Sequence, residues 1–325
     1  MKAGKVSESI LKRSVLKQLH KVISKEAFAP KVGQDYGSFG QTMGELCFAE
    51  STMPFCYEGS VAATIYRACN NLWCAPAVPK GILVNVLVPT TSNEQELRTL
   101  MAQVADVCEK ENLLVLGGHT EVVRTVTQMT LCITAIGERC ENVYWNCNRV
   151  KPGMDLVVLN WIGLEGTSIL AKTKEETLAS YYAVPFIENA KRFEQYLSIQ
   201  SMAAVATMSG VVAMHDLSEG GIYGALWEMA QCAGVGLEID LKKIPIRQET
   251  VEICEFFDLN PYKILSGGCL LVAAEDGNSI VMELEKTGIP AVVIGKATDS
   301  NDRVLINEEE RRFLETTQTD ELYHL

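Results

Sequence analysis

The feature that most limits how this chain can fold is a short apolar run that stops at a His-Asp pair and is followed by two glycines. Residues 209–214 form the run, His215 and Asp216 end it, and Gly220 and Gly221 open a segment whose apolar residues recur at helical spacing. This order predicts a strand, a tight turn and a helix. Because the first N–H groups of a helix lack partners within it, a glycine-rich helix start can seat a phosphate. The same residues also suit an ordinary turn and helix cap.

The composition is typical of a globular protein with an acidic surface. The chain has 325 residues, 47% hydrophobic and 22% charged, with a formal net charge of −12. Its length allows two domains. The negative charge argues against nucleic-acid binding, which needs clustered Lys and Arg. No apolar run approaches the roughly 20 residues of a membrane span, so no membrane association is expected. The basic N-terminus, with lysines from Lys2 to Lys17, is expected to form an amphipathic helix rather than a signal peptide.

The cysteines predict reduced thiols rather than disulfides or a zinc site. There are 11 of them, scattered and odd in number, and no Cys-x-x-Cys pair occurs. Most stand among apolar residues, which favours buried thiols in a cytoplasmic protein. Cys69 and Cys74, which flank Asn70-Asn71, are the candidates for a reactive thiol.

Two α+β domains are predicted, residues 1–150 and 151–325, because turn-forming residues at 151–155 precede a second series of strands and glycine loops. In the first domain, helices are expected at 61–69, ending at Asn70-Asn71, and from the N-cap Asn93 to about 112. Strands are expected at 81–88, 113–116 and 129–136, and a loop at 117–121 follows the second of them. The second domain is expected to contain strands at 156–159, 269–274 and 291–294, a glycine loop at 163–167, and a charged surface tail at 308–325.

Four loops share a pattern of glycine, asparagine and acidic residues. They lie at residues 33–37, 70–71, 117–121 and 215–221, and the loop from Asn260-Pro261 to Ser266-Gly267-Gly268 follows them. In this order they make the chain resemble the AIR synthase (aminoimidazole ribonucleotide synthase) superfamily over roughly residues 28–307. Among the members, it looks most like the hydrogenase maturation factor HypE and the AIR-synthase-related proteins.

The resemblance implies a two-domain AIR-synthase-like fold, with an N-terminal domain that contributes to a dimeric β-barrel and a C-terminal α/β domain. It also implies a homodimer that binds ATP and Mg²⁺ and acts on a small molecule. In this superfamily an oxygen or selenium nucleophile attacks the γ-phosphate, which in most members activates an amide or carbonyl oxygen. Catalysis of that kind relies on positioning and charge neutralisation by carboxylates, Mg²⁺ and backbone N–H groups.

Two acidic residues match positions that the superfamily directs at Mg²⁺ and phosphate. Asp35 matches the acidic residue of the early loop, and Asp216 matches that of the second-domain loop. Both are therefore candidate metal ligands, and Asp216 is also a candidate catalytic residue. The candidate phosphate contacts that the resemblance implies are Gly117, Gly118, Thr120, Glu219, Gly220 and Gly221.

The sequence departs from the superfamily pattern at other acidic positions. Asn70 and Asn71 are candidate cofactor contacts, but they stand where many members have Asn-Asp, so one metal-directed carboxylate is missing. Glu50 is aligned only loosely with an Asp. His119 stands where members have Asp or Glu. Since neutral imidazole is a poor Mg²⁺ ligand, His119 is expected to contact phosphate and to act in catalysis by stabilising charge or transferring a proton.

These departures leave alternatives open. The site could hold one metal ion instead of two, or a softer metal shared by His119 and His215 with Asp35 or Asp216.

HypE also ends in a Pro-Arg-Ile-Cys tail whose thiol carries the carbamoyl group, whereas no cysteine follows Cys269 here, so a thiol-carried mechanism is not expected in cis. The first hypothesis is an ATP-dependent enzyme that activates an amide or carbonyl oxygen. The alternative is a non-catalytic protein that binds a nucleotide or phosphate ligand, with a regulatory or maturation role.

Overall fold

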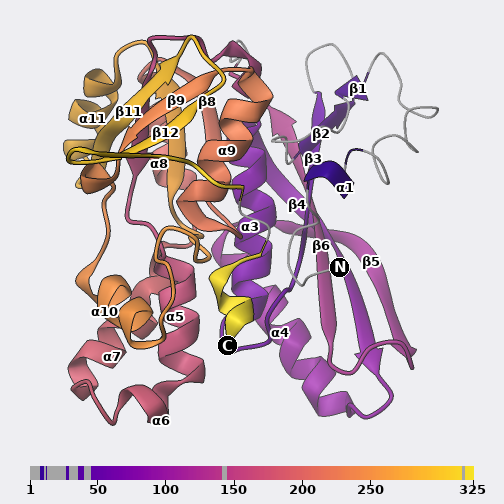
Figure 1. The fold of residues 1–325 in the computed structure, drawn as a ribbon. Coiled ribbons are helices and arrows are strands. Elements are labelled where there is room, and N and C mark those ends of the chain that lie inside the picture. Colours follow the sequence, from indigo (N-terminus) through magenta and orange to yellow (C-terminus); the bar gives the residue numbers. More distant parts are fainter. Residues whose placement is uncertain are drawn as a thin grey trace. The chain divides into compact units, whose positions relative to one another are not determined.

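The computed structural model describes residues 8–10, 12, 27–28, 36–39, 45–140, 145–316 and 319–325. They form two compact units, each built on its own sheet (Figure 1). The N-terminal domain takes the described residues from 27 to 140. The C-terminal domain takes residues 145–325 together with the short segment at 8–12. Asp35 and most of the basic N-terminus lie outside the described residues.

The N-terminal domain has a six-stranded sheet in the order β1-β2-β3-β6-β4-β5. Its strands are β1 (Ala27–Phe28), β2 (Tyr36–Phe39), β3 (Leu46–Thr52), β4 (Ala77–Pro89), β5 (Leu114–Val123) and β6 (Thr130–Arg139). All neighbours are antiparallel except β4 and β5, which run parallel with α4 (Glu94–Lys110) as the connection. Over the described residues the sheet is open, with β1 and β5 at its edges. The expected dimeric barrel therefore remains a proposal about two chains.

Helices cover one face of this sheet. The helix α3 (Ser60–Cys74) and α4 share a buried cluster with alternate residues of β4, such as Ile82, Val84 and Val86. Because side chains alternate along a strand, the residues between them, including Asn85, face the other side of the sheet. Asn85 is exposed, and register aligns it with Cys132 of β6 on one side and His119 of β5 on the other.

Two predicted boundaries in this domain are wrong. The helix does not end at Asn70-Asn71 but continues to Cys74, with both asparagines buried within it. The residues expected to form a loop at 117–121 continue the strand β5, because β4 runs beside them and pairs with them in register. The predicted start of α4 is confirmed, since the Asn93 side chain accepts from the Glu96 N–H in a capping box.

The C-terminal domain has a seven-stranded sheet in the order β13-β12-β9-β11-β7-β10-β8. Its strands are β7 (Asp155–Leu159), β8 (Val211–Asp216), β9 (Gly236–Asp240), β10 (Leu270–Ala274), β11 (Ala291–Thr298), β12 (Arg303–Asn307) and β13 (Glu310–Phe313). Among the described strands of this sheet, only β9 and β12 pair in parallel. The domain is therefore α+β with a mixed sheet, which corrects the expectation of an α/β domain.

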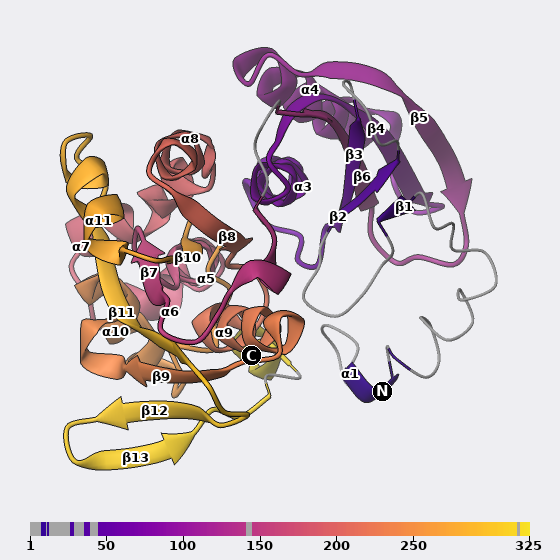
Figure 2. The same cartoon turned by 90° about the horizontal axis from the view of Figure 1, so that it is seen from above.

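Helices pack on both faces of this sheet, so β7 and β10 are buried throughout. On one face α9 (Gly221–Ala233) packs against β8 and β10, and α8 (Gln200–Met208) and α11 (Gly277–Glu285) lie on the other (Figure 2). The remaining described α-helices are α1 (Glu8–Ile10), α5 (Leu164–Thr173), α6 (Glu175–Leu178), α7 (Val184–Lys191) and α10 (Gln248–Phe256). In the described part of the chain, no helix is long and apolar enough to cross a membrane.

The sequence predicted that the C-terminal tail is a charged surface segment, but part of the tail is buried. The strand β13 pairs with β12, and Leu314, Asp320 and Leu322 are buried. The chain then forms a short 3-10 turn, Glu321–His324. The tail is therefore a built part of the C-terminal domain.

Candidate phosphate-binding site

Three loops of the C-terminal domain leave the sheet at the same end of adjacent strands. Leu159 of β7, Leu270 of β10 and Asp216 of β8 lie in register across the three strands. The loops that follow β7, precede β10 and follow β8 must therefore meet. The last of them carries the predicted turn, and α9 begins after Gly220, as predicted from the two glycines.

Hydrogen bonds join the three loops. Gly163, after β7, donates its N–H to the Ser266 hydroxyl at 2.8 Å, and Ser266 donates its own N–H to the Ser218 carbonyl at 3.3 Å. Asn160 donates its side-chain amide to the Gly268 carbonyl at 2.8 Å. These bonds link all three loops, so their backbone groups have defined positions before any ligand binds.

Two glycines of the cluster are closely packed, one against backbone and the other against a side chain. A Cβ at Gly221, where φ is +60°, would lie 2.6 Å from the Tyr262 carbonyl oxygen and 2.7 Å from that of Ile264. A Cβ at Gly267 would lie 2.1 Å from Oε2 of the Glu165 side chain. Glycine therefore lets the loop before β10 approach both the start of α9 and the first turn of α5.

Buried acids surround these loops. Asp216 ends β8 and Glu165 stands in the first turn of α5, and each is only 3% exposed. A buried carboxylate is costly unless N–H groups or a cation compensate it. Oxygen donors of this kind are those that Mg²⁺ prefers. The described residues contain no group of three or more His, Cys, Asp or Glu arranged to hold a metal, so further oxygen ligands would come from water or phosphate.

His215 lies beside Asp216 and contacts groups on both sides of its ring. Its Nδ1–H donates to the Asp216 carbonyl at 2.7 Å, and its Nε2 lies 3.1 Å from a carboxylate oxygen of Glu228 on α9. Since a carbonyl only accepts, Nδ1 carries a proton. His215 thus links the end of β8 to α9. A protonated Nδ1 cannot bind a metal, which leaves only Nε2, beside Glu228, for the soft-metal alternative.

The first N–H groups of α9 already have partners. Gly220 donates to the Asp320 carboxylate at 2.8 Å, and Gly221 donates to the Ser218 carbonyl at 3.1 Å. Glu219, the third predicted member of this phosphate contact, is partly exposed in the same turn. Burial raises the pKa of Asp320 to about 7, although backbone N–H groups hydrogen-bond it. The start of α9 therefore holds an anionic group, and in this structure the group is the Asp320 carboxylate of the same domain.

The predicted phosphate contacts of the N-terminal domain lie along the edge strand β5. His119 is 69% exposed at its side chain, and its Nε2 lies 3.4 Å from Glu121. His119 and Thr120 point to opposite faces because side chains alternate along a strand. Gly118 approaches β4 so closely that a Cβ would lie 1.9 Å from the Val84 carbonyl oxygen. This strand can offer His119 to a ligand from one face, but not His119 and Thr120 together.

The other acidic and amide positions of this domain are less accessible than the sequence suggested. Asn70 and Asn71 are 3% and 8% exposed within α3, where they contribute to helix packing. Glu50 lies on β3, where it accepts a hydrogen bond from the Thr134 hydroxyl at 3.0 Å. Asp35 lies outside the described residues, so its role as a metal ligand stays a prediction.

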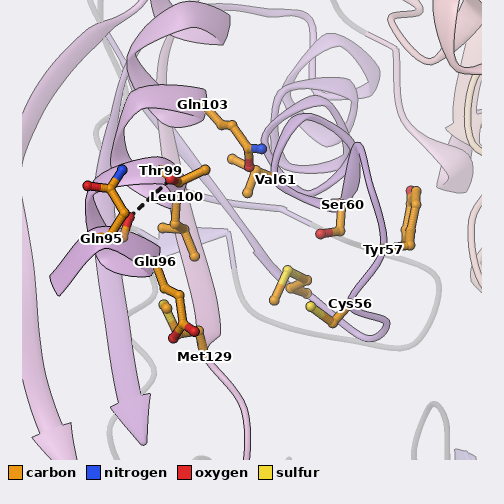
Figure 3. Close-up of a pocket in the computed structure, with 11 residues that line it drawn as sticks. Cys56, Tyr57, Ser60, Val61, Gln95, Glu96, Thr99, Leu100, Gln103 and Met129 are labelled. Atoms are coloured by element: carbon orange, nitrogen blue, oxygen red, sulfur yellow. Dashed lines mark hydrogen bonds between the residues drawn. The ribbon is translucent and has the colours of Figure 1, made fainter. Parts of the chain in front are cut away.

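The N-terminal domain also contains a cavity of about 310 Å³ between α4 and the chain that leads into α3. Figure 3 shows Cys56 and Ser60 on one side and Gln95 and Thr99 on the other. All 11 cysteines are free and described, and Cys56 is the exposed one. Cys69 and Cys74, the candidates for a reactive thiol, are buried, and burial raises the pKa of Cys69 to about 12, so neither has the exposure that a reactive thiol needs.

Comparison with known proteins gives the class of this fold. The AIR synthase related protein C-terminal domain matches residues 151–307, and the AIR synthase related protein N-terminal domain matches residues 56–139. The chain belongs to the AIR synthase related family.

Particular members of the family are similar over most of the chain. Carbamoyl dehydratase HypE of Rhodobacter capsulatus is 30% identical over 234 residues, which make up 70% of this chain and 66% of that protein. A crystal structure of the hydrogenase maturation protein HypE in complex with ATP superposes with a TM-score of 0.71 at 15% identity, covering 96% of this chain and 95% of that one. AaThiL complexed with AMPPCP and TMP superposes with a TM-score of 0.73 at 15% identity, covering 98% and 99%. These structural likenesses show the fold.

Sequence reasoning missed two functional candidates in the C-terminal domain, Glu165 and Asp320. Glu165 stands within the predicted glycine loop at 163–167, and its place beside two glycines was an available signal. Asp320 caps a helical turn locally, through Leu322, but its contact with Gly220 joins residues 100 positions apart. Only the structure reveals a contact of that range.

Proposed function

We propose that this protein is an ATP-dependent enzyme of the AIR synthase/HypE type, which activates an amide or carbonyl oxygen of a small molecule. The observation that carries the proposal is the meeting of three loops at the ends of β7, β10 and β8, with Asp216 buried among them and a glycine-rich helix start beside it. Relatives crystallised with ATP and with AMPPCP have the same fold and support it.

The residues take roles that follow from their chemistry. Asp216 and Asp35 are each proposed as a ligand of Mg²⁺, which would neutralise phosphate charge when bound. The N–H groups at the start of α9 are proposed to donate to phosphate oxygens, for which Asp320 and the Ser218 carbonyl are competing acceptors at Gly220 and Gly221. His119, exposed on β5, is proposed to stabilise developing charge or to transfer a proton.

A homodimer belongs to the same proposal. β5 is an edge strand over the described chain, and its Leu114, Val115, Leu116 and Val122 side chains are all at least half exposed. An apolar edge of this kind is a liability unless another chain covers it. Two N-terminal domains that share this edge would complete the barrel implied by the family.

The test is a calorimetric titration of the protein with ATP, with and without Mg²⁺, and an ADP assay on the same samples. We expect Mg²⁺-dependent binding, and ADP release once an amide or carbonyl substrate is supplied. His119→Ala should lower ADP formation by about 100-fold and leave the melting temperature unchanged, because the side chain is exposed. Arg98→Ala, an equally exposed change on α4, is the control. Equal activity in His119→Ala would remove this residue from the mechanism.

One observation favours the second candidate, a non-catalytic binder of nucleotides or phosphate ligands. Where many members of the superfamily have Asn-Asp, this chain has two amides, Asn70 and Asn71, and both are buried within α3. A binder of this kind would give saturable binding with no ADP in any substrate mixture. Steady ADP formation by pure protein would rule it out.

A further inference from the structure

Residues 319–325 place an acidic side chain on the glycine loop that precedes α9. Asp320 accepts the Gly220 N–H at 2.8 Å on Oδ2 and the Leu322 N–H at 3.0 Å on Oδ1. The Leu265 N–H also hydrogen-bonds this carboxylate. Asp320 is 2% exposed. Three N–H groups therefore surround the two oxygens, away from water.

Two of these donors belong to the loops and not to the segment. Gly220 starts α9, and Leu265 lies in the loop before β10, which is joined to the α9 turn through Ser266 and Ser218. Backbone N–H groups at a helix start are donors for phosphate oxygens. The carboxylate and a phosphate oxygen therefore compete for the same Gly220 N–H.

The contact is unfavourable for the ionised carboxylate. Several backbone N–H donors normally lower the pKa of a carboxyl group, yet burial raises that of Asp320 to about 7. Glu219, in the loop that Asp320 contacts, raises this pKa further. The other titratable neighbours are Glu321 in the same segment and the Cys254 thiol of α10, whose pKa both acids raise. Because burial disfavours the ionised form of Asp320, its carboxylate holds the Gly220 N–H less strongly than an ordinary helix cap would.

Beyond Asp320, the segment contacts the loop that follows α10 and forms none of the described strands. Glu321 accepts the Asn260 N–H at 3.1 Å, and the Leu322 side chain is buried. Tyr323 donates its N–H back to the Asp320 carbonyl, within the same turn. His324 and Leu325 are exposed. The segment can leave without disturbing a strand of the sheet.

We propose that residues 319–325 are an internal competitor for the phosphate site: Asp320 occupies the Gly220 N–H until a ligand phosphate displaces it, and the segment then leaves the loop. The inference rests on the proposed function for the nature of the ligand. Binding of the phosphate ligand is weakened by the free energy of displacing the segment, and removal of Asp320 should strengthen it.

The test compares the whole protein with two variants by calorimetry, using MgATP and inorganic tripolyphosphate as ligands. Asp320→Ala removes the competing oxygens and should bind both ligands about tenfold more tightly than wild type. Glu321→Gln changes the neighbouring acid, keeps an oxygen for the Asn260 N–H, and should bind like wild type. Thermal melting confirms that each variant is folded.

Hydrogen exchange on the wild-type protein gives a second measurement. Saturating tripolyphosphate should accelerate exchange at Leu322 and Tyr323 and slow it at Gly220. If Asp320→Ala does not fold, this measurement decides alone, and unchanged exchange at Leu322 overturns the inference.

The outcomes separate this inference from the proposed function. Equal MgATP affinity in wild type and in folded Asp320→Ala overturns the competitor and leaves the enzyme standing. Tighter tripolyphosphate binding by Asp320→Ala, with no ADP formed by either protein, supports the competitor and rejects the enzyme. If neither ligand binds to any of the proteins, both are rejected.

Discussion

At the scale of single residues, the two adjacent glycines of β5 differ in the space around them. Their φ angles are similar, 157° and 150°, but a Cβ at Gly118 would strike the Val84 carbonyl at 1.9 Å, while one at Gly117 would meet only the end of the Leu83 side chain at 3.6 Å. We expect Gly117→Ala to cost about 1 to 3 kcal/mol of unfolding free energy, because its positive φ strains any L side chain, and Gly118→Ala to cost more, because the clash is added to the same strain. Urea unfolding of the two variants checks this. Equal losses would show that backbone conformation, not space, selects glycine here.

Asp320 makes the stability of the C-terminal domain depend on pH. Its folded-state pKa of about 7 lies above the ordinary value of 3.8, so the folded state binds its proton more tightly than the unfolded state does. The stabilisation is complete below about pH 4 and is lost as the pH rises through 7. We expect Asp320 to reduce stability by about 2 kcal/mol between pH 5 and pH 8.

Melting curves at both pH values check this effect of Asp320. Asp320→Asn, which cannot ionise, should lose this part of the pH dependence. Asp258→Asn, a change at an exposed acid after α10, should keep it. A melting temperature of Asp320→Asn that falls with pH as steeply as that of wild type would contradict the prediction.

Cys56 should be the first thiol to react in the folded protein. It is the exposed cysteine and lines the cavity beside α4, whereas burial raises the pKa of Cys69 and of Cys254 to about 12. Since the thiolate is the reactive form, Ellman's reagent should modify about one thiol rapidly. Cys56→Ser should remove this fast phase, and Cys69→Ser should keep it. A fast phase that survives Cys56→Ser would assign the reactivity to another cysteine.

The residues that could be predicted from the sequence are those whose partners are local. The cap at Asn93 and the helix start at Gly220-Gly221 depend on groups within a few positions, and both are present. Asp320 could not be predicted as a partner of Gly220, because the pairing depends on where the sheet returns the end of the chain. The burial of Glu165 depends in the same way on the approach of Gly267.

At the scale of elements, β5 shows why strands and loops were confused. Gly117 and Gly118 are typical of a turn, but the adjacent strand β4 pairs with them and keeps them extended. In α3, Asn70 and Asn71 suit a helix end, yet the apolar residues Leu72 and Cys74 continue the buried face, and the helix follows them. In both cases tertiary pairing outweighed local preference.

The exposed side chains of β5 carry a prediction about association. If two chains meet at this edge, a double change of Val115 and Val122 to lysine should convert a dimer to a monomer, because each lysine would have to lose its hydration in the contact. Light scattering after gel filtration gives the mass. Met208→Lys, on an apolar residue of α8 that is 90% exposed, is the matched control and should leave the mass unchanged. A wild-type monomer would reject the proposed dimer.

At the scale of the whole molecule, the number of domains and their α+β character followed from the alternation of apolar runs and glycine loops. The mixed pairing of the second sheet did not, because strand direction depends on how the connections cross and not on the strands themselves. The parallel pair β9 and β12, for example, is joined through residues that contain α10, β10 and α11. The sequence contains no local signal for such a path.

The place of β5 at the end of its sheet has a further consequence for dilute solutions. A strand paired on one side exchanges its amide protons more readily than a central strand such as β6, because fewer contacts must open. If association covers that strand, mass action links folding to concentration. The melting temperature of the N-terminal domain should then rise with protein concentration, and β5 should be the first strand to lose protection when the protein is diluted.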